Sequence, residues 1–213
     1  MTAKHTLPEK LMLSYAAGTL PEAFDLVIAS HLSLCDESRI GVEAYEAIGG
    51  TIIEKEIPVS MSPGALDRCF GRLDGQAPRP KSGDAVNAVF PKPLRDMIGG
   101  DIDTVNWRSI GRGVKQAIIE TEGRATVRLL SIPGGVEMPE HGHQGMEVTL
   151  VLQGAFKDGQ DRFARGDIEV ATDDMDHQPV AEDGDVCICL AATENPLRFN
   201  SFVPKLLQPL FRI

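Results

Sequence analysis

Apolar residues in the first third of the chain recur at the three- and four-residue spacing that is typical of amphipathic helices. The pattern predicts helices over residues 8–17, 21–35, 36–48 and 62–73. The connections between these segments are short, so the N-terminal region is expected to be all-α.

Residues at the expected helix ends support these boundaries. Both 6–9 and 19–22 have the form Thr, two residues, Glu with a proline between them, which predicts a capping box before each of the first two helices. Gly49 and Gly50 predict the end of the third helix. Residues 52–58 fit either an extended or a helical segment.

The second half of the chain carries short apolar runs separated by turn residues, which predicts an all-β sandwich or barrel. The runs cover residues 107–119, 125–132, 148–152, 168–171, 186–190 and 197–202. An apolar tail at 206–213, interrupted by Pro209, fits packing on a sheet or a subunit contact.

Between the two patterns lies a stretch rich in proline, glycine and charge, QAPRPKSGD at residues 76–84. We therefore expect two domains, a helical domain over residues 1–78 and a β domain over residues 86–213, joined by a linker at 79–85.

Composition excludes some classes of function. A net charge of −10 argues against direct nucleic-acid binding, which needs clustered Lys and Arg. No apolar run approaches the length that spans a bilayer, and residues 1–7 lack the pattern of a signal peptide. A cytoplasmic location is the expectation.

The four cysteines form no disulfide framework and are expected to be core residues, ligands or redox sites. Cys187 and Cys189 stand two apart on a predicted strand and so face the same way. They are small core residues, or they lie near a metal and take part in redox sensing.

The clearest chemical signal is a set of metal-capable residues at fixed spacing. Gly135 is followed, after five residues, by His141, then His143, Glu147 and Gly154. Two histidines two apart project from one face of a strand, and Glu147 opens the next apolar run. We expect the three side chains to converge from adjacent antiparallel strands.

His177, which follows Gly166 after ten intervening residues, supplies a fourth candidate ligand. Three imidazoles and one carboxylate suit zinc, iron, manganese or nickel. A pair of histidines in the acidic loop at 140–143 is by itself also compatible with simple solvation, but the full spacing favours a metal site.

This spacing resembles the two motifs of the cupin superfamily, which are small jelly-roll β-barrels that hold a metal inside. The first motif matches throughout. The second keeps Gly166 and His177, whereas Thr172, Asp174 and Ala181 replace its usual Pro, Gly and Asn.

A second motif lies in the helical region. His31, three residues, Cys35, two residues and Ser38 nearly match the zinc motif of anti-sigma factors. Followed by a cupin, the whole chain resembles the ChrR-type zinc-dependent anti-sigma factors. The resemblance implies that His31 and Cys35 bind zinc together with His5 upstream.

Ser38 departs from that motif, because the family has a cysteine there and a hydroxyl is a poor zinc ligand. The site then binds zinc weakly with help from water, Asp36 or Glu37, has lost the metal, or carries an introduced serine.

The resemblance implies an anti-sigma factor that holds a sigma factor of the extracytoplasmic-function group through its helical domain. A stress signal, reactive oxygen such as singlet oxygen in this family, would be sensed through the zinc-binding cupin domain and would release the sigma factor. Neither nucleic acid nor membrane is an expected partner.

Two other functions fit the same residues. One is a cupin metalloenzyme, a dioxygenase or isomerase, in which the metal keeps open positions for oxygen or substrate. The other is a binding module for a metal or small molecule whose helices serve dimerisation. The identity of the metal tests the enzymatic function. Four protein ligands close a tetrahedral zinc site, but they leave positions open for oxygen or substrate on octahedral iron.

Overall fold

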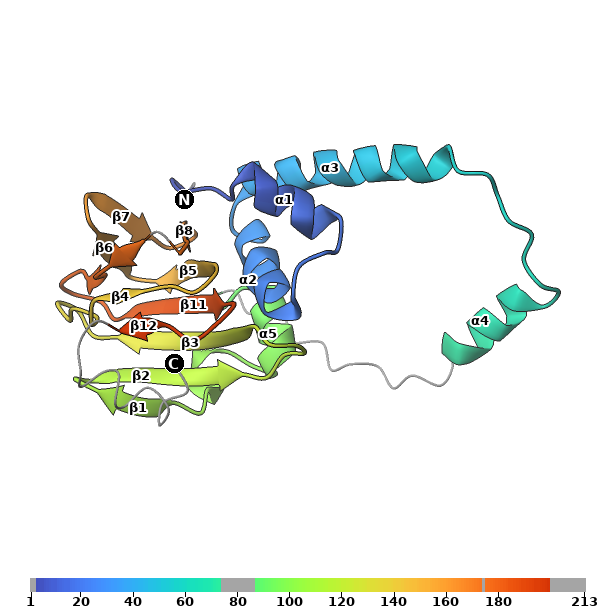
Figure 1. The fold of residues 1–213 in the computed structure, drawn as a ribbon. Helices are drawn as coiled ribbons and strands as arrows, with labels where there is room; N and C mark the ends of the chain where they lie inside the picture. The colour runs from blue at the N-terminus through green and yellow to red at the C-terminus, as the bar shows by residue number, and fades with distance from the viewer. Residues whose placement is uncertain (1–2, 74–86, 174, 200–213) are drawn as a thin grey trace.

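The computed structural model describes residues 3–73, 87–173 and 175–199, and Figure 1 shows helices packed beside a β-rich body. The predicted linker at 79–85 and the apolar tail at 206–213 lie outside the described residues. Within the described part, no helix combines the length and the apolar content that crossing a membrane requires. We call residues 3–73 the helical region and residues 108–199 the β-region.

The four predicted helices are present, but the third is longer than predicted. They are α1 (Glu9–Ala16), α2 (Glu22–Leu32), α3 (Asp36–Glu54) and α4 (Ala65–Leu73). The prediction that Gly49 and Gly50 end α3 is wrong. Neither glycine takes the left-handed φ of a helix C-cap, and the apolar spacing continues from Ile48 to Ile52.

The two predicted capping boxes are also wrong. The N-cap residues are Pro8 and Pro21, both in extended backbone, and neither helix has a side-chain cap. Each proline thus stands one position before the helix rather than in its first turn, which leaves Thr6 and Thr19 too far upstream to cap it. Proline serves at this position because its missing N–H is not needed by the helix.

Two short elements between the regions were not predicted, namely α5 (Lys92–Ile98) and the 3-10 helix η1 (Ile102–Thr104). Leu94 is buried completely on α5, which packs against α2. A helix of only seven residues shows too little periodicity to be found in the sequence.

Twelve strands in the described residues form three sheets. The largest has the order β1-β2-β3-β11-β5-β8, and the smaller sheets have the orders β10-β6-β7 and β12-β4-β9. The strands are β1 (Arg108–Gly111), β2 (Val114–Ile119), β3 (Thr126–Ile132), β4 (His141–Gly142), β5 (Glu147–Gln153), β6 (Ala155–Asp158), β7 (Asp161–Ala164), β8 (Ile168–Ala171), β9 (Asp176–His177), β10 (Val180–Ala181), β11 (Cys187–Thr193) and β12 (Arg198–Phe199). Hydrogen bonding among the described residues does not join them into one closed barrel.

The predicted strand at 107–119 is divided into β1 and β2 by a tight turn. Arg112 and Gly113 take φ values of 51° and 80°, the left-handed conformation of a hairpin turn. A single apolar run thus gives two strands because glycine allows the chain to reverse direction.

The helical region and the β-region share one hydrophobic core. Phe24, Val27 and Ile28 on α2 are completely buried and belong to the same cluster as Leu129 of β3 and Leu150 of β5. Helix α2 contacts β3, β5 and β11, the middle strands of the largest sheet. Burial of this size stabilises the contact by about 1.5–3 kcal/mol for each large side chain, so the two regions support one another.

Gly154 is required where β5 turns into β6. Its φ is +68°, and a Cβ there would lie 2.9 Å from the carbonyl oxygen of Val186 and 3.0 Å from the Cα of Cys187. Both neighbours are backbone atoms, which cannot move aside as a flexible side chain can.

We expect Gly154→Ala to lower the free energy of unfolding by about 1–3 kcal/mol more than Gly159→Ala does. Gly159 also has a positive φ, but a Cβ there meets no atom within 4 Å. The comparison therefore isolates the collision from the backbone strain, and urea unfolding of the two variants measures it. Equal losses of stability would contradict the proposed packing.

Candidate metal centre

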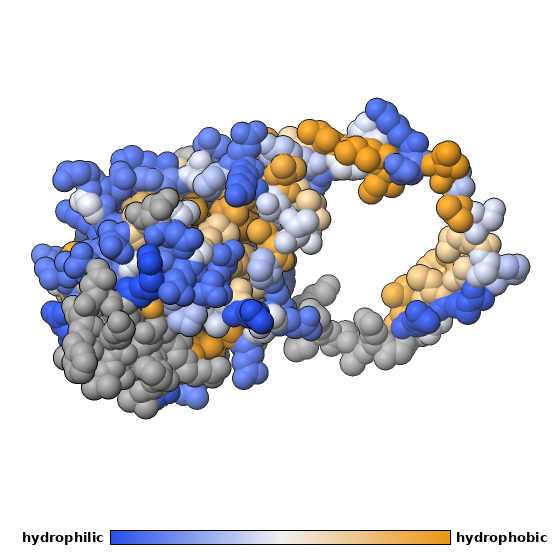
Figure 2. Space-filling model, in the orientation of Figure 1, coloured by the Kyte–Doolittle hydropathy of each residue, from blue (hydrophilic) through white to orange (hydrophobic). Residues whose placement is uncertain are grey.

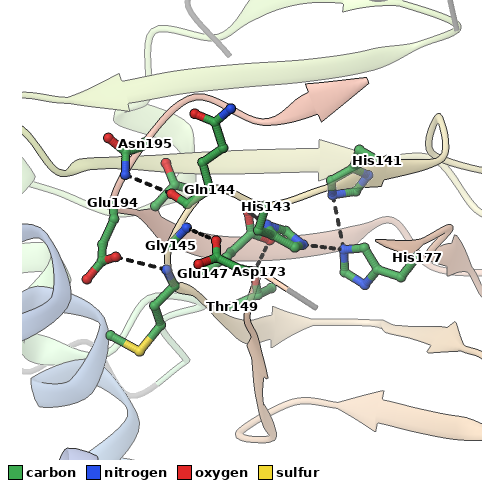
Figure 3. A network of polar contacts seen from close by, with 12 residues as sticks. His141, His143, Gln144, Gly145, Glu147, Thr149, Asp173, His177, Glu194 and Asn195 are labelled. Carbon is green, nitrogen blue, oxygen red and sulfur yellow. Dashed lines mark hydrogen bonds and ion pairs between the residues drawn. The ribbon is translucent and has the colours of Figure 1, made fainter. Parts of the chain in front are cut away.

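The four residues that the sequence predicts as ligands are brought together in the β-region (Figure 3). One potential ligand atom from each of His141, His143, Glu147 and His177 lies within 4.8 Å of the others. The three histidines are buried, and the side chain of Glu147 is 12% exposed. The group is therefore a compact donor set largely shielded from water.

The strands that carry the ligands differ in part from the prediction. β4 and β5 belong to different sheets, so the expectation that Glu147 comes from the strand adjacent to the histidines is wrong. Instead β4 pairs with β9, which places His141 directly opposite His177. Glu147 reaches the group from the first position of β5, which lies between β11 and β8 in the largest sheet.

The donor atoms are arranged as a metal requires. The Nε2 atom of His177 lies 3.1 Å from Nε2 of both His141 and His143. Nδ1 of His141 donates to the carbonyl of Pro139 at 2.8 Å, and Nδ1 of His177 donates to Asp158 at 2.8 Å. Since their protons are on Nδ1, both Nε2 atoms present lone pairs to the same point.

The protonation of the group fits a cation. Burial lowers the pKa of His141 and His143 to about 4, so both rings are neutral and able to bind a metal near pH 7. Burial also raises the pKa of Glu147. A nearby cation would favour its ionised form. These donors fit a divalent ion.

Carboxyl groups behind His177 support its orientation, and they were not predicted from the sequence. Asp158, Glu169 and His177 form a second group whose potential ligand atoms lie within 4.8 Å of one another. Burial, followed by the negative charge of Asp158, raises the pKa of Glu169 to about 9, so Glu169 is protonated at neutral pH. The sequence signal was a glutamate within the apolar run of β8.

The loop between β4 and β5 is held by polar contacts from distant segments (Figure 3). Asp173 accepts a hydrogen bond from the backbone N–H of Gly145, and Glu194 accepts one from Met146 at 3.0 Å. Asn195 donates to the carbonyl of Gln144 at 2.7 Å. These contacts fix the backbone that follows His143 and thus the position of its ring.

The ligands predicted in the helical region form a hydrogen-bonded network around Ser38. Nδ1 of His31 donates to the carbonyl of Gly166 at 2.9 Å, and burial lowers the pKa of His31, which keeps the ring neutral. Nε2 of His31 then accepts a hydrogen bond from the Ser38 hydroxyl at 2.8 Å. The Ser38 oxygen in turn accepts from the N–H of Leu7 at 3.0 Å and from the Cys35 thiol at 3.5 Å.

His5 lies apart from this network. Its ring packs on Phe163 with centroids 4.3 Å apart, and its Nε2 lies 3.2 Å from the carbonyl oxygen of Arg162. Among the described residues, no group of three potential ligands within 4.8 Å includes His5, His31 or Cys35. Zinc at this site stays a prediction.

Cys187 and Cys189 face the same way, as predicted. Their sulfur atoms are 3.6 Å apart on β11, and both belong to a buried cluster with Phe156 and Phe163. The hydrogen bond with Cys187 and burial raise the pKa of the Cys189 thiol, so Cys189 is protonated at neutral pH. Both residues therefore contribute to the core.

The metal-free protein should lose stability as the pH falls from about 7 to about 4. The unfolded chain binds protons near the ordinary histidine pKa of 6.5, whereas His141 and His143 in the folded chain have a pKa of about 4. Between these values the unfolded state binds more protons, so acidification favours unfolding. Urea midpoints in the presence of a chelator measure the effect, and a double variant with His141→Gln and His143→Gln should show a smaller fall. An equal fall in both proteins would show that His141 and His143 do not cause the loss of stability.

Known proteins are similar to this chain over its full length, including both the helical region and the β-region. A family model described as the ChrR cupin-like domain matches residues 95–196. The anti-sigma-E factor ChrR of Cereibacter sphaeroides is 54% identical over 213 residues, which is 100% of each chain. The crystal structure of Rhodobacter sphaeroides SigE in complex with the anti-sigma ChrR matches with a TM-score of 0.79 and 50% identity, over 90% of this chain and 99% of that chain.

These matches confirm the predicted fold class, a helical N-terminal region followed by a cupin domain. They also favour the regulatory prediction over the enzymatic one, because the full-length relative is an anti-sigma factor. The chain belongs to the ChrR family of anti-sigma factors.

Proposed function

We propose that this protein is an anti-sigma factor that holds a sigma factor of the extracytoplasmic-function group in the cytoplasm. Binding is through the helical region, and a stress signal received in the β-region releases the partner. Full-length similarity to ChrR supports the class of partner. The observation that carries the proposal is an apolar surface on the helical region.

This surface, which we call the apolar helical surface, extends from the second half of α3 to α4. Figure 2 shows apolar side chains gathered on both helices. Its members are exposed, for example Ile53 at 73% and Phe70 at 56%, and α4 has no buried residue. The surface comprises Ile48, Ile52, Ile53, Ile57, Val59, Met61, Leu66, Phe70 and Leu73. Exposed apolar patches of this extent mark protein interaction sites.

The β-region is attached to the helical region at the turn between β7 and β8. Asp167 accepts hydrogen bonds from the backbone N–H groups of Lys4 at 2.5 Å and His5 at 3.0 Å. The carbonyl of the preceding Gly166 accepts from His31. Strand β8 begins at Ile168 and carries Glu169, which lies behind the metal centre. One short segment thus contacts both the metal centre and the first residues of the helical region. We propose that the signal passes from the metal centre to the helical region through this segment.

We propose zinc as the metal of the β-region, held by the three histidines and Glu147. Three nitrogens and one carboxylate oxygen complete a tetrahedral zinc site, which leaves no position for a substrate. When bound, the ion supplies positive charge that neutralises Glu147 and cross-links three strands. Asp158 keeps His177 in the tautomer that leaves Nε2 available.

Reactive oxygen, singlet oxygen in particular, is the signal that membership of this family suggests. A change in the ligands of the metal centre would alter β8 and hence the contacts of Asp167. The proposal requires that the complex dissociates after exposure to a photosensitiser and light, and that chains altered at the metal ligands dissociate less.

Replacing Ile53 and Phe70 by aspartate should weaken binding of the cognate sigma factor at least about tenfold, because charged side chains would replace buried apolar contacts. Titration of the purified partner measures the dissociation constant. Val186→Asp is the matched control, since Val186 is apolar and exposed but lies in the β-region. If the control weakened binding as much as the double variant, the apolar helical surface would not be the binding site.

Elemental analysis of the full chain should find about one zinc, which His143→Gln removes because it deletes one of four ligands. His31→Gln is the matched variant in the helical region and should leave that zinc in place. Two zinc ions in the native chain, one of them lost on His31→Gln, would instead support the predicted site at His5, His31 and Cys35. Zinc retained in His143→Gln but lost with His31→Gln would contradict the assignment to the β-region.

A further inference from the structure

The β-region encloses a cavity of about 340 Å³ beside the metal centre. This volume lies within the range of small-molecule sites, roughly 300–1,000 Å³. Exposed Arg112 and Glu137 line one edge, so the cavity opens to solvent between the β1–β2 turn and the segment before β4. A molecule could therefore reach the interior without unfolding the sheets.

Most of the cavity wall is apolar. Side chains from strands of two sheets and from the segment before β4 contribute to it, among them Ile110, Val114, Leu130, Ile132, Met138 and Phe156. An apolar wall of this kind favours a hydrocarbon chain or ring, because burying such a group removes apolar surface from water. For comparison, an engineered dry cavity of about 150 Å³ binds benzene. The larger cavity can therefore hold a hydrocarbon group at least as large as benzene.

The polar residues of the cavity are concentrated around Arg128 and the metal ligands. Arg128 on β3 is only 6% exposed, and its Nη1 lies 3.4 Å from Oε1 of Gln116, which is itself 2% exposed. His141 and Glu147 line the same cavity, so an occupant held by Arg128 shares the cavity with two of the metal ligands.

Charge decides what kind of polar group fits there. Arg128 carries a positive charge, and the proposed metal would add two more against the single carboxylate of Glu147. Glu169 also lines the cavity. Even with Glu147 and Glu169 both ionised, Arg128 and a divalent metal leave one positive charge in excess. A buried guanidinium prefers the planar, bidentate geometry of a carboxylate.

We infer that this cavity binds a small apolar monocarboxylate, with its carboxylate near Arg128 and the metal centre and its hydrocarbon part against the apolar wall. The inference extends the proposed function, since it rests on a metal-bearing β-region and makes that region a receptor for a diffusible molecule. It does not depend on the sigma factor.

Octanoate is the probe for the test, added to the full-length zinc-loaded chain in a calorimetric titration. Octanoate should bind at least about tenfold more tightly than octanol, which lacks the charge, and than propionate, which lacks the chain. Equal affinity for octanoate and octanol would overturn the role of the carboxylate. No binding of octanoate by a chain that contains zinc would overturn the whole inference and leave the proposed function intact.

Two variants locate the site. Arg128→Gln should weaken octanoate binding at least about tenfold, whereas Arg124→Gln, an exposed arginine outside the cavity, should not change it. Ala181→Leu adds bulk to the cavity wall, replaces neither Arg128 nor a metal ligand, and should also weaken binding. Because Ala181→Leu retains the guanidinium, it tests the site even if Arg128→Gln fails to fold. Unchanged binding in Ala181→Leu would place octanoate elsewhere and overturn the inference.

The zinc content of each sample separates this inference from the proposed function. A chain that binds octanoate in this cavity but holds no metal would support the cavity and contradict the proposed zinc centre. A chain that holds zinc and releases octanoate on Arg128→Gln would support both.

Discussion

Lone pairs that face a common point without a proton between them repel one another, and this constraint governs the β-region. His141 and His177 each use their Nδ1 proton on a neighbouring oxygen, so their Nε2 atoms meet as acceptors 3.1 Å apart. A cation bound by these nitrogens would convert that repulsion into a cross-link between β4 and β9. Two very short strands, β4 and β9 with two residues each, hold this arrangement, so a bound ion would support the pairing of these strands.

In the helical region, the metal-capable side chains are satisfied by hydrogen bonds instead of facing one another as acceptors. Hydrogen bonds join Ser38 to both His31 and Cys35. The Nδ1–H of His31 donates to the carbonyl of Gly166 in the β-region. A hydroxyl both donates and accepts, so Ser38 can join three partners where a metal would join four ligands. The contact between His31 and Gly166, one of those that attach the two regions, thus relies on neutral groups whose partners are all within the protein.

Sequence patterns predicted the local parts of this structure better than the distant ones. The spacing of the histidines and Glu147 identified the metal-capable group, because ligands close in sequence are fixed by local geometry. Asp158 and Glu169 were missed, since their place behind His177 depends on how distant strands approach. The end of α3 was wrong because glycine is only a weak helix breaker when the apolar spacing continues. The unpredicted Ser38 network likewise joins Leu7 to Ser38, 31 positions apart, and His31 to Gly166, 135 positions apart.

The length of α3 has a mechanical consequence. The helix has 19 residues and therefore extends about 28 Å, beginning next to the Ser38 network and ending in the apolar helical surface. Its first turns are anchored by buried Ser38 and Val42, whereas Ile52 and Ile53 near its far end are exposed. A rotation of about 10° at the anchored end displaces the far end by about 5 Å. In the release that we propose, the helix would act as a lever arm, so that a change of a fraction of an ångström at the β7–β8 turn would give a shift as large as a side chain at the apolar helical surface.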